Sequence, residues 1–188
     1  MDNQQELLDR ALELFSQRGY DAVGVREVVE AVGVTKPTLY HYFDSKRGLL
    51  EALLKREAGQ MLSQILQAAQ YQGDLVLTLE NITRTYFGIA QNNTTFYRMQ
   101  LAMYYAPLES EANQAIRPFS AQQHEILESV FIQAADDHGN LRGRHQRYAA
   151  GFLGGINAMI GLYLNADLVL TGEVVYLTVH QFMHGIFS

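Results

Sequence analysis

Residues 25–46, VREVVEAVGVTKPTLYHYFDSK, carry the pattern that most restricts the fold of this chain. Their first part has four valines at spacings of three or four residues: Val25, Val28, Val29 and Val32. This spacing places the valine side chains on one face of a helix. Gly33 follows, and a glycine can adopt the left-handed conformation that ends a helix. The pattern therefore predicts a short helix followed by a tight turn.

A second short helix is predicted directly after this turn. Thr35 is a good N-cap, because its hydroxyl can accept a hydrogen bond from the backbone N–H of Thr38. Pro37 falls in the first turn, where its missing N–H would have had no helical partner. The inward face of this helix would consist of Leu39, Tyr42 and Phe43. The outward face would consist of Lys36, Thr38, Tyr40 and His41.

Two short helices joined by such a turn have two interpretations. One is a helix-turn-helix, whose second helix enters the major groove of DNA. The cation, hydroxyls and imidazole of the outward face suit phosphate oxygens and base edges. The other is an ordinary αα corner with a polar outer face, which has the same spacing of apolar residues.

The same stretch resembles a known family. Residues 34–43, VTKPTLYHYF, followed by Ser45-Lys46 and Leu49-Leu50, resemble the recognition segment of TetR-family regulators. The preceding residues fit as well, with a helix that ends in Leu14-Phe15-x-x-x-Gly19-Tyr20 and then Val25-Arg26-Glu27-Val28. The resemblance implies an all-α protein in two parts. These are an N-terminal three-helix helix-turn-helix DNA-binding domain, residues 1–46, and a larger helical ligand-binding and dimerisation domain, residues 47–188.

The resemblance also implies which residues contact DNA. We expect the groove or its walls to be faced by Thr35, Lys36, Pro37, Thr38, Tyr40 and His41, with Arg26 reaching a base or a phosphate. Lys46 is expected to grip a phosphate together with nearby backbone amides, and the alternative is a solvated surface lysine. Gly24 stands where relatives often carry Ser or Thr, so a hydroxyl–phosphate contact is missing there, and Val23 lacks another.

The distribution of charge matters more for DNA binding than its sum. The net charge is −6, which by itself argues against a nucleic-acid partner. Between residues 33 and 56, however, five cations outnumber two acids: Lys36, Lys46, Arg47, Lys55 and Arg56 against Asp44 and Glu51. A local basic face on an acidic body is compatible with site-specific binding and predicts weak non-specific affinity.

Composition favours a folded cytoplasmic protein. Hydrophobic residues make up 48% of the 188 residues, which is typical of a globular chain. The absence of cysteine fits a reducing compartment, and the polar start MDNQQELLDR is not a signal peptide. The longest apolar stretch, residues 148–164, contains Asn157 and several glycines and falls short of a membrane-spanning helix.

Helical spacing continues along the rest of the chain. Beyond the two short helices, we expect helices over 4–18, 46–69, 75–90, a segment capped by Thr94 and ended by Pro107, 111–135 with an interruption or bend near Pro118, 141–165 and 172–187.

The last two expected helices carry a candidate dimer interface. The first has a stripe of small residues, and the second has apolar residues on one side: Ala150, Gly154, Ala158 and Gly161, then Val175, Val179 and Phe182. Small residues let two helices approach closely. These residues either complete the core of the monomer or join two copies, and the family resemblance favours a homodimer. A recognition helix of about eight residues reads only a few base pairs, so two copies across a palindrome supply the missing selectivity.

Aromatic and methionine residues of the larger domain are candidates for a small-molecule pocket, with a few polar groups to fix orientation. They are Tyr86, Phe96, Met99, Met103, Tyr104, His124, Phe131, Phe152, Asn157, Met159 and Tyr163. Any single one of these aromatics is more often part of a plain core than of a ligand wall. His180 and His184 lie four apart and could bind a metal, but no third ligand is evident nearby, so neither a metal nor a cofactor is predicted.

Together these observations predict a ligand-responsive transcriptional regulator, a repressor, that binds a palindromic double-stranded operator as a homodimer. A small, largely apolar effector would release it. No phosphate-binding glycine loop, paired carboxylates or nucleophile motif supports an enzyme. The rival interpretation is a helical apolar-ligand-binding or interaction protein without DNA binding, supported by the acidic net charge and the hydroxyls missing at Val23 and Gly24.

Overall fold

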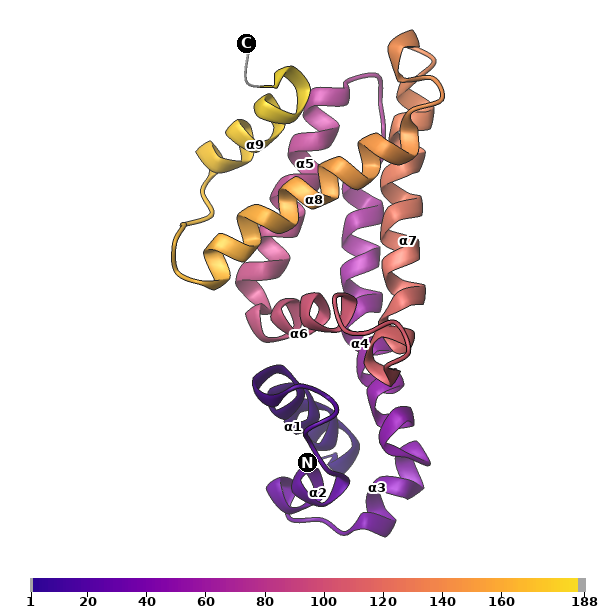
Figure 1. Ribbon diagram of the computed structural model, residues 1–188, viewed down its shortest axis with the longest axis vertical. Helices are drawn as coiled ribbons and strands as arrows, with labels where there is room; N and C mark the ends of the chain where they lie inside the picture. Colours follow the sequence, from indigo (N-terminus) through magenta and orange to yellow (C-terminus); the bar gives the residue numbers. More distant parts are fainter. Residues whose placement is uncertain (1, 186–188) are drawn as a thin grey trace. The chain divides into compact units, whose positions relative to one another are not determined.

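The computed structural model describes residues 2–185, and every regular element within them is helical (Figure 1). The all-α prediction is therefore confirmed. The elements are α1 (Asn3–Arg18), α2 (Val25–Val32), α3 (Lys36–Phe43), α4 (Lys46–Ala68), α5 (Leu75–Asn92), α6 (Thr94–Tyr104), α7 (Glu111–Ala134), a 3₁₀ turn (Gly139–Leu141), α8 (His145–Leu164) and α9 (Gly172–His184).

Two helix ends and the interior of one helix differ from the sequence-based expectation. Asn93, not Thr94, caps α6, because its side chain accepts the backbone N–H of Phe96 at 3.1 Å. α7 is not interrupted at Pro118, which lies inside the helix and is exposed, so water can satisfy the carbonyl that proline leaves without a partner. α9 ends at His184, and residues 186–187 of the expected last helix lie outside the described residues.

The chain forms two compact units. Unit 1 takes in the described residues up to Gln60 together with Asn93–Ser120, and unit 2 takes in Met61–Asn92 and the described residues from Ala121 onward. α4 and α7 therefore each contribute to both units. The expected boundary after residue 46 does not coincide with this division. Unit 1 contains not only α1–α3 but also the first part of α4, all of α6 and the start of α7. The boundary at 46 remains a prediction for the DNA-binding segment.

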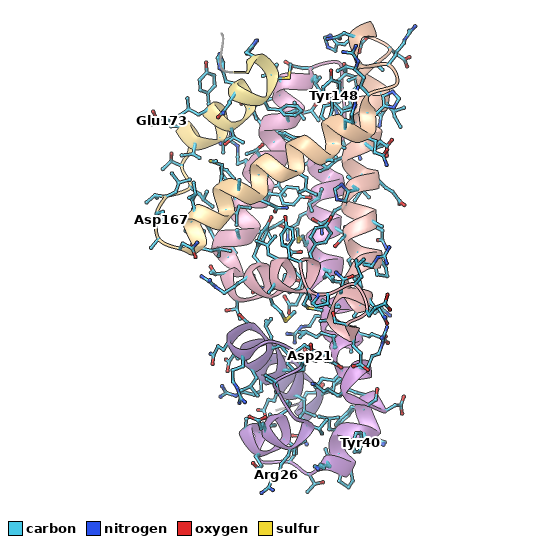
Figure 2. The ribbon with its side chains drawn as sticks, viewed as in Figure 1. Asp21, Arg26, Tyr40, Tyr148, Asp167 and Glu173 are labelled. Atoms are coloured by element: carbon cyan, nitrogen blue, oxygen red, sulfur yellow. The ribbon has the colours of Figure 1, made fainter. Side chains whose placement is uncertain are left out.

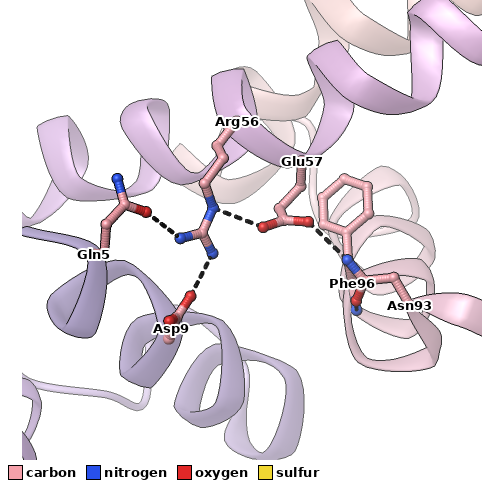
Figure 3. A network of polar contacts seen from close by, with 6 residues as sticks. All are labelled: Gln5, Asp9, Arg56, Glu57, Asn93 and Phe96. Carbon is pink, nitrogen blue, oxygen red and sulfur yellow. Dashed lines mark hydrogen bonds and ion pairs between the residues drawn. The ribbon is translucent and has the colours of Figure 1, made fainter.

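Unit 1 is built around α1, which packs against α2, α3 and α6. Its apolar core is contributed mainly by Leu7, Leu8, Ala11, Phe15, Val28, Val29, Leu39, Phe43, Leu49, Leu50, Leu53 and Leu54, all buried. A polar network fastens α1 to α4 and to the start of α6 (Figure 3). In it, the Arg56 guanidinium contacts Asp9 at 2.8 Å and Glu57 at 2.7 Å, and Glu57 accepts from Asn93 at 2.7 Å.

In unit 2, α5, α8 and α9 pack against one another (Figure 1). An aromatic cluster joins α7, α8 and α9: the Phe152 and Phe182 ring centroids are 5.1 Å apart, and Phe131 lies 6.0 Å from Phe182. α8 contains the longest apolar stretch of the chain, yet neither it nor any other described helix is both long and apolar enough to cross a bilayer.

Candidate DNA-binding surface

The turn between α2 and α3 has the geometry expected from its sequence. Gly33 adopts φ 77°, a left-handed conformation that a residue with a side chain rarely takes. Its N–H and that of Val34 are bonded to α2 carbonyls, the latter to Val29 at 3.0 Å. The glycine thus closes α2 and lets the chain turn at once into α3. We call α2, this turn and α3, residues 25–43, the reading segment.

The start of α3 differs in one detail from the prediction. Thr35 is the N-cap residue, but its hydroxyl makes no cap hydrogen bond to a backbone N–H. It pairs instead with the Thr38 hydroxyl at 3.0 Å. Two hydroxyls are therefore held side by side on an exposed helix start, where each keeps hydrogen-bonding capacity for a phosphate or a base edge.

The two faces of α3 are clearly separated. Leu39 and Phe43 are 0% and 5% exposed and fix the helix to the core of unit 1. Lys36, Pro37 and His41 are exposed, and Tyr40, labelled in Figure 2, is 43% exposed. The expected inward orientation of Tyr42 is wrong. It is 38% exposed and its ring contacts that of His41, because Leu39 and Phe43 already fill the inward face.

Arg26 extends from α2 into solvent at the same end of unit 1 (Figure 2). Its side chain is 77% exposed and its guanidinium donates to the Glu30 carboxylate at 2.6 Å, which raises the pKa of Arg26. An exposed ion pair of this kind is weak. Arg26 can therefore exchange Glu30 for a phosphate or a base edge at small cost.

The start of α2 is supported by a carboxylate and not by a hydroxyl. Glu27 accepts the Gly24 N–H at 2.9 Å and also pairs with Arg18. These hydrogen bonds lower the pKa of Glu27. Val23 is only 1% exposed, so position 23 belongs to the core of this chain. A hydroxyl there would not face DNA, so Val23 no longer supports a protein without DNA binding; the acidic net charge and Gly24 still do.

Lys46, expected to grip a phosphate, is held inside unit 1 in this structure. Its ammonium donates to the Tyr20 carbonyl at 2.6 Å and lies 4.0 Å from the centroid of the Tyr20 ring. Partial burial lowers the pKa of Lys46. A phosphate contact by Lys46 therefore requires its side chain to leave the Tyr20 carbonyl, and that role stays a prediction.

The turn between α3 and α4 is unusually tight. Ser45 caps α4, with its hydroxyl accepting the Gly48 N–H at 2.9 Å. A Cβ placed on Gly48 would lie 1.9 Å from the Phe43 carbonyl oxygen, a distance that no side chain tolerates. Glycine at position 48 is therefore required by the close approach of the two helices. This requirement was not evident in the sequence, where Gly48 is only an unusual residue in a first helical turn.

The residues predicted to bind a ligand are split between the two units. In unit 1, Phe96, Met99 and Met103 are buried, whereas Tyr104 is 42% exposed and contacts Tyr105. In unit 2, the buried members are Tyr86, Phe131 and Phe152, and the half-buried ones are His124, Asn157, Met159 and Tyr163. Tyr86 donates to the Gln123 side-chain oxygen at 3.2 Å within the core. Burial raises the pKa of Tyr86, so this hydroxyl stays protonated.

A separate groove of about 770 Å³ lies in unit 2 between α4 and α5. It contains none of the predicted ligand residues. Its lining is mostly polar: Gln64, Gln67, Ala68, Gln70, Gln72, Asp74, Leu77, Thr78, Asn81, Arg84, Thr85, Gly88 and Asn92.

The predicted dimer residues also fall into two groups. Ala150, Gly154 and Ala158 are exposed along one side of α8, and Gly161 is half-buried. Val175 and Val179, by contrast, are 3% and 1% exposed. Phe182 joins the aromatic cluster of unit 2. The α9 members therefore complete the core of this chain, because α9 turns that side toward α5 and α8.

His180 and His184 approach each other on α9, with ring centroids 4.7 Å apart. Among the described residues, however, no three histidine, cysteine or acidic side chains gather closely enough to hold a metal ion.

The structure adds contacts that the sequence did not reveal. Tyr20 and Arg47 contact α7, through Glu111 and Gln114 respectively. The sequence alone assigns Glu111 no role. Its partner lies 91 residues away, so no local pattern could have identified the pair.

Known proteins resemble this chain most clearly in the same region. Residues 7–53 match the family described as "Bacterial regulatory proteins, tetR family". The transcriptional activator FasR of Mycolicibacterium smegmatis is 34% identical over 94 residues, which are 50% of this chain and 43% of FasR. The transcriptional repressor KstR2 of Rhodococcus jostii is 34% identical over 80 residues, 43% of this chain and 39% of KstR2. The chain thus matches less than half the length of these relatives.

The fold as a whole is also shared. The transcriptional regulator FadR of Bacillus subtilis, in a structure with stearoyl-CoA, superposes with a TM-score of 0.80 at 18% identity, over 97% of this chain and 98% of that one. Residues 7–53 therefore match the tetR family of bacterial regulatory proteins, and the chain as a whole shares the fold of a solved bacterial transcriptional regulator.

Proposed function

We propose that the chain is a ligand-responsive transcriptional repressor that binds a palindromic operator as a homodimer. The observation that supports this most directly is the two-sided α3. Leu39 and Phe43 anchor the helix, and Lys36, Tyr40 and His41 are left exposed on a short helix that follows a tight turn. This is the arrangement in which a recognition helix enters the major groove. Arg26 and the Thr35–Thr38 hydroxyl pair extend the same polar surface.

Dimerisation follows from the small size of this surface. A helix of eight residues contacts too few base pairs for selective binding, and two copies about one DNA turn apart double the contacts. The exposed stripe of Ala150, Gly154 and Ala158 supports α8 as the site where a second copy approaches. On α9, Tyr176 and Leu177 are 53% and 52% exposed, so they are better candidates for contact with a second copy than the buried Val175 and Val179.

Release of DNA by a small, largely apolar effector is the second part of the proposal. An effector shifts the population only if it binds better to a state in which the recognition helices are differently spaced. Within unit 2, the buried Tyr86, Phe131 and Phe152 offer an apolar environment, and Gln123 and Asn157 offer polar groups. FadR, a protein of the same fold, has been crystallised with stearoyl-CoA, so this fold can accommodate a long apolar group.

Selection of DNA fragments from a random-sequence pool, followed by sequencing, tests the proposal. The expected result is enrichment of a palindrome whose half-sites are centred about one helical turn apart. Bound fragments without a common sequence, or no bound fragments, would instead favour a helical apolar-ligand-binding or interaction protein.

The Lys36→Ala variant tests α3 directly. Its affinity for the selected operator should fall roughly tenfold to a hundredfold, with altered preference at particular base pairs, because a lost base contact costs about 1–3 kcal/mol. Lys55→Ala is the matched control, since Lys55 is an exposed lysine of the same chain outside the reading segment. If Lys36→Ala and Lys55→Ala lose equal affinity, and lose it uniformly across DNA sequences, Lys36 contributes only general positive charge and no base contact.

Lys46→Ala tests the predicted phosphate contact. Binding should weaken evenly across sequences, and the slope of log affinity against log salt should become shallower by about one unit. An unchanged slope would show that Lys46 stays on the Tyr20 carbonyl when DNA binds. Lys55→Ala again serves as the control.

A further inference from the structure

Two side-chain contacts fasten the reading end of unit 1 to the first turn of α7. The Tyr20 hydroxyl, in the loop between α1 and α2, donates to the Glu111 carboxylate at 2.6 Å. The Arg47 guanidinium, at the start of α4, donates to the Gln114 side-chain oxygen at 3.3 Å. Glu111 and Gln114 are three residues apart and therefore lie on one face of α7. The loop before the reading segment and the helix after it are thus attached to the same turn.

Tyr20 is the centre of this arrangement. Its side chain is 5% exposed, and its ring contacts that of Phe15 edge to face at a centroid distance of 5.2 Å. Its carbonyl and ring hold the Lys46 ammonium. Burial, followed by the hydrogen bond to Glu111, raises the pKa of Tyr20, so at neutral pH its hydroxyl remains a donor. One side chain therefore joins the end of α1, the start of α4 and the start of α7.

This attachment is distinct from the network of Figure 3. There, Arg56 links Gln5 and Asp9 of α1 to Glu57, farther along α4, which in turn binds Asn93. That network holds α1 itself. Tyr20 and Arg47 instead contact α7 from the two chain segments that flank the reading segment. α7 continues into unit 2, so the flanking segments are tied to a helix that both units share.

We propose that the Tyr20–Glu111 hydrogen bond, assisted by Arg47–Gln114, is a latch that fixes the orientation of the reading segment on α7. It thereby sets the spacing at which two copies recognise their half-sites. The proposal rests on the proposed function for its consequence at DNA, but the bond itself can be tested without DNA. Tyr20 and Glu111 act here as positioning residues and touch no base or phosphate. A fixed orientation is a form of preorganisation, which restricts binding to one geometry.

The variants are chosen to remove the latch and leave its surroundings in place. Tyr20→Phe keeps the ring, the contact with Phe15 and the carbonyl that holds Lys46, and loses only the hydroxyl. Glu111→Ala removes the acceptor, whereas Glu111→Gln keeps an acceptor oxygen and should rescue the latch. Glu109→Ala is the matched control, because Glu109 is an exposed acid of the same segment and its loss changes the net charge equally.

Hydrogen exchange of the full-length chain is the first measurement. The Val23 N–H is bonded to the Tyr20 carbonyl at 3.3 Å and reports on the loop between α1 and α2. Tyr20→Phe and Glu111→Ala should each speed its exchange about tenfold, as expected from loss of a hydrogen bond to a charged group. The double variant should exchange no faster than either single one, because both remove the same bond. Wild-type exchange rates in the two single variants would overturn the latch.

Half-site spacing is the second measurement, and a purely structural role would not change it. The affinity for the selected operator is compared with that for the same operator carrying one inserted base pair between its half-sites. The ratio of the two affinities should be about threefold to tenfold smaller in the latch variants than in wild type, because a freer reading segment tolerates the altered spacing. Glu111→Gln and Glu109→Ala should keep the wild-type ratio.

The two measurements separate the possible failures. Faster exchange with an unchanged spacing ratio would overturn the positioning role and leave an ordinary structural hydrogen bond. If the wild-type chain selects no DNA, the proposed function fails, and the exchange rates still decide whether the Tyr20–Glu111 bond restrains the loop.

Discussion

Each unit of the protein contains a tyrosine that donates to a carboxylate over the same distance. Tyr20 binds Glu111 at 2.6 Å in unit 1, and Tyr71 binds Asp137 at 2.6 Å in unit 2. Their surroundings differ. Tyr20 is 5% exposed and carries an ammonium ion against its ring, whereas the Tyr71–Asp137 bond is exposed and joins two surface segments.

The two hydroxyls also differ in the main cause that raises their pKa. For Tyr71 the hydrogen bond to Asp137 is the main cause that raises the pKa, to about 12. For Tyr20 burial is the main cause, and it raises the pKa further. Equal bond lengths therefore do not imply equal contributions to stability. The Tyr20–Glu111 bond is partly buried, and its break costs more on the tyrosine side, because the buried Tyr20 hydroxyl cannot turn to water as the exposed Glu111 carboxylate can.

The largest difference between the two tyrosines is expected when the whole side chain is removed and the loss of stability is compared. Tyr20→Ala should lower the free energy of unfolding by about 3–5 kcal/mol, since it deletes a buried ring. Tyr71→Ala should lower it by less than about 1 kcal/mol, as expected for a surface substitution. Denaturant unfolding of both variants measures the two values. Similar losses would mean that burial does not distinguish the two bonds.

A smaller loss of stability is expected from a change at Gly48, in the first turn of α4, close to Lys46. Gly48→Ala should lower the free energy of unfolding by about 1–3 kcal/mol, because the added methyl group would meet the Phe43 carbonyl oxygen and displace the turn before α4.

Gly59→Ala is the control within the same helix. No atom lies within 4 Å of a Cβ at Gly59, so this change should raise stability by up to about 1 kcal/mol through helix propensity. A stabilising Gly48→Ala would show that the start of α4 is less tightly built than the structure indicates.

The smallest effect concerns the titration of Tyr71. Asp137→Ala should return its pKa from about 12 toward the ordinary value near 10, measured by ultraviolet absorbance of the folded protein. Because folding raises this pKa, the bond contributes fully below about pH 10 and its contribution is lost as the pH rises through 12. Asp136→Ala, at the neighbouring acid, should leave Tyr71 near 12. If the pKa of Tyr71 falls equally in Asp137→Ala and Asp136→Ala, general negative charge raises it, and not the hydrogen bond to Asp137.

Much of the candidate surface could be predicted because its signals are local. The valine spacing, Gly33 and Pro37 act on residues within one or two turns of themselves, so they specified α2, the turn and α3 without knowledge of the rest. Leu39 was correctly placed inside and Tyr40 outside for the same reason. Tyr42 was misplaced because helical spacing tolerates it on either side, and the choice depended on how much space Leu39 and Phe43 left.

The sequence by itself therefore determined the helical class, the reading segment and the family match over residues 7–53. Only the tertiary structure decided that Val175 and Val179 belong to the core of the chain, that Gly48 must lack a side chain, and that Lys46 rests on Tyr20. The reason is physical. Periodicity and capping are encoded over a few residues, whereas the burial of a side chain and the partner of a hydroxyl depend on segments that are distant in the chain, as Tyr20 and Glu111 are by 91 residues.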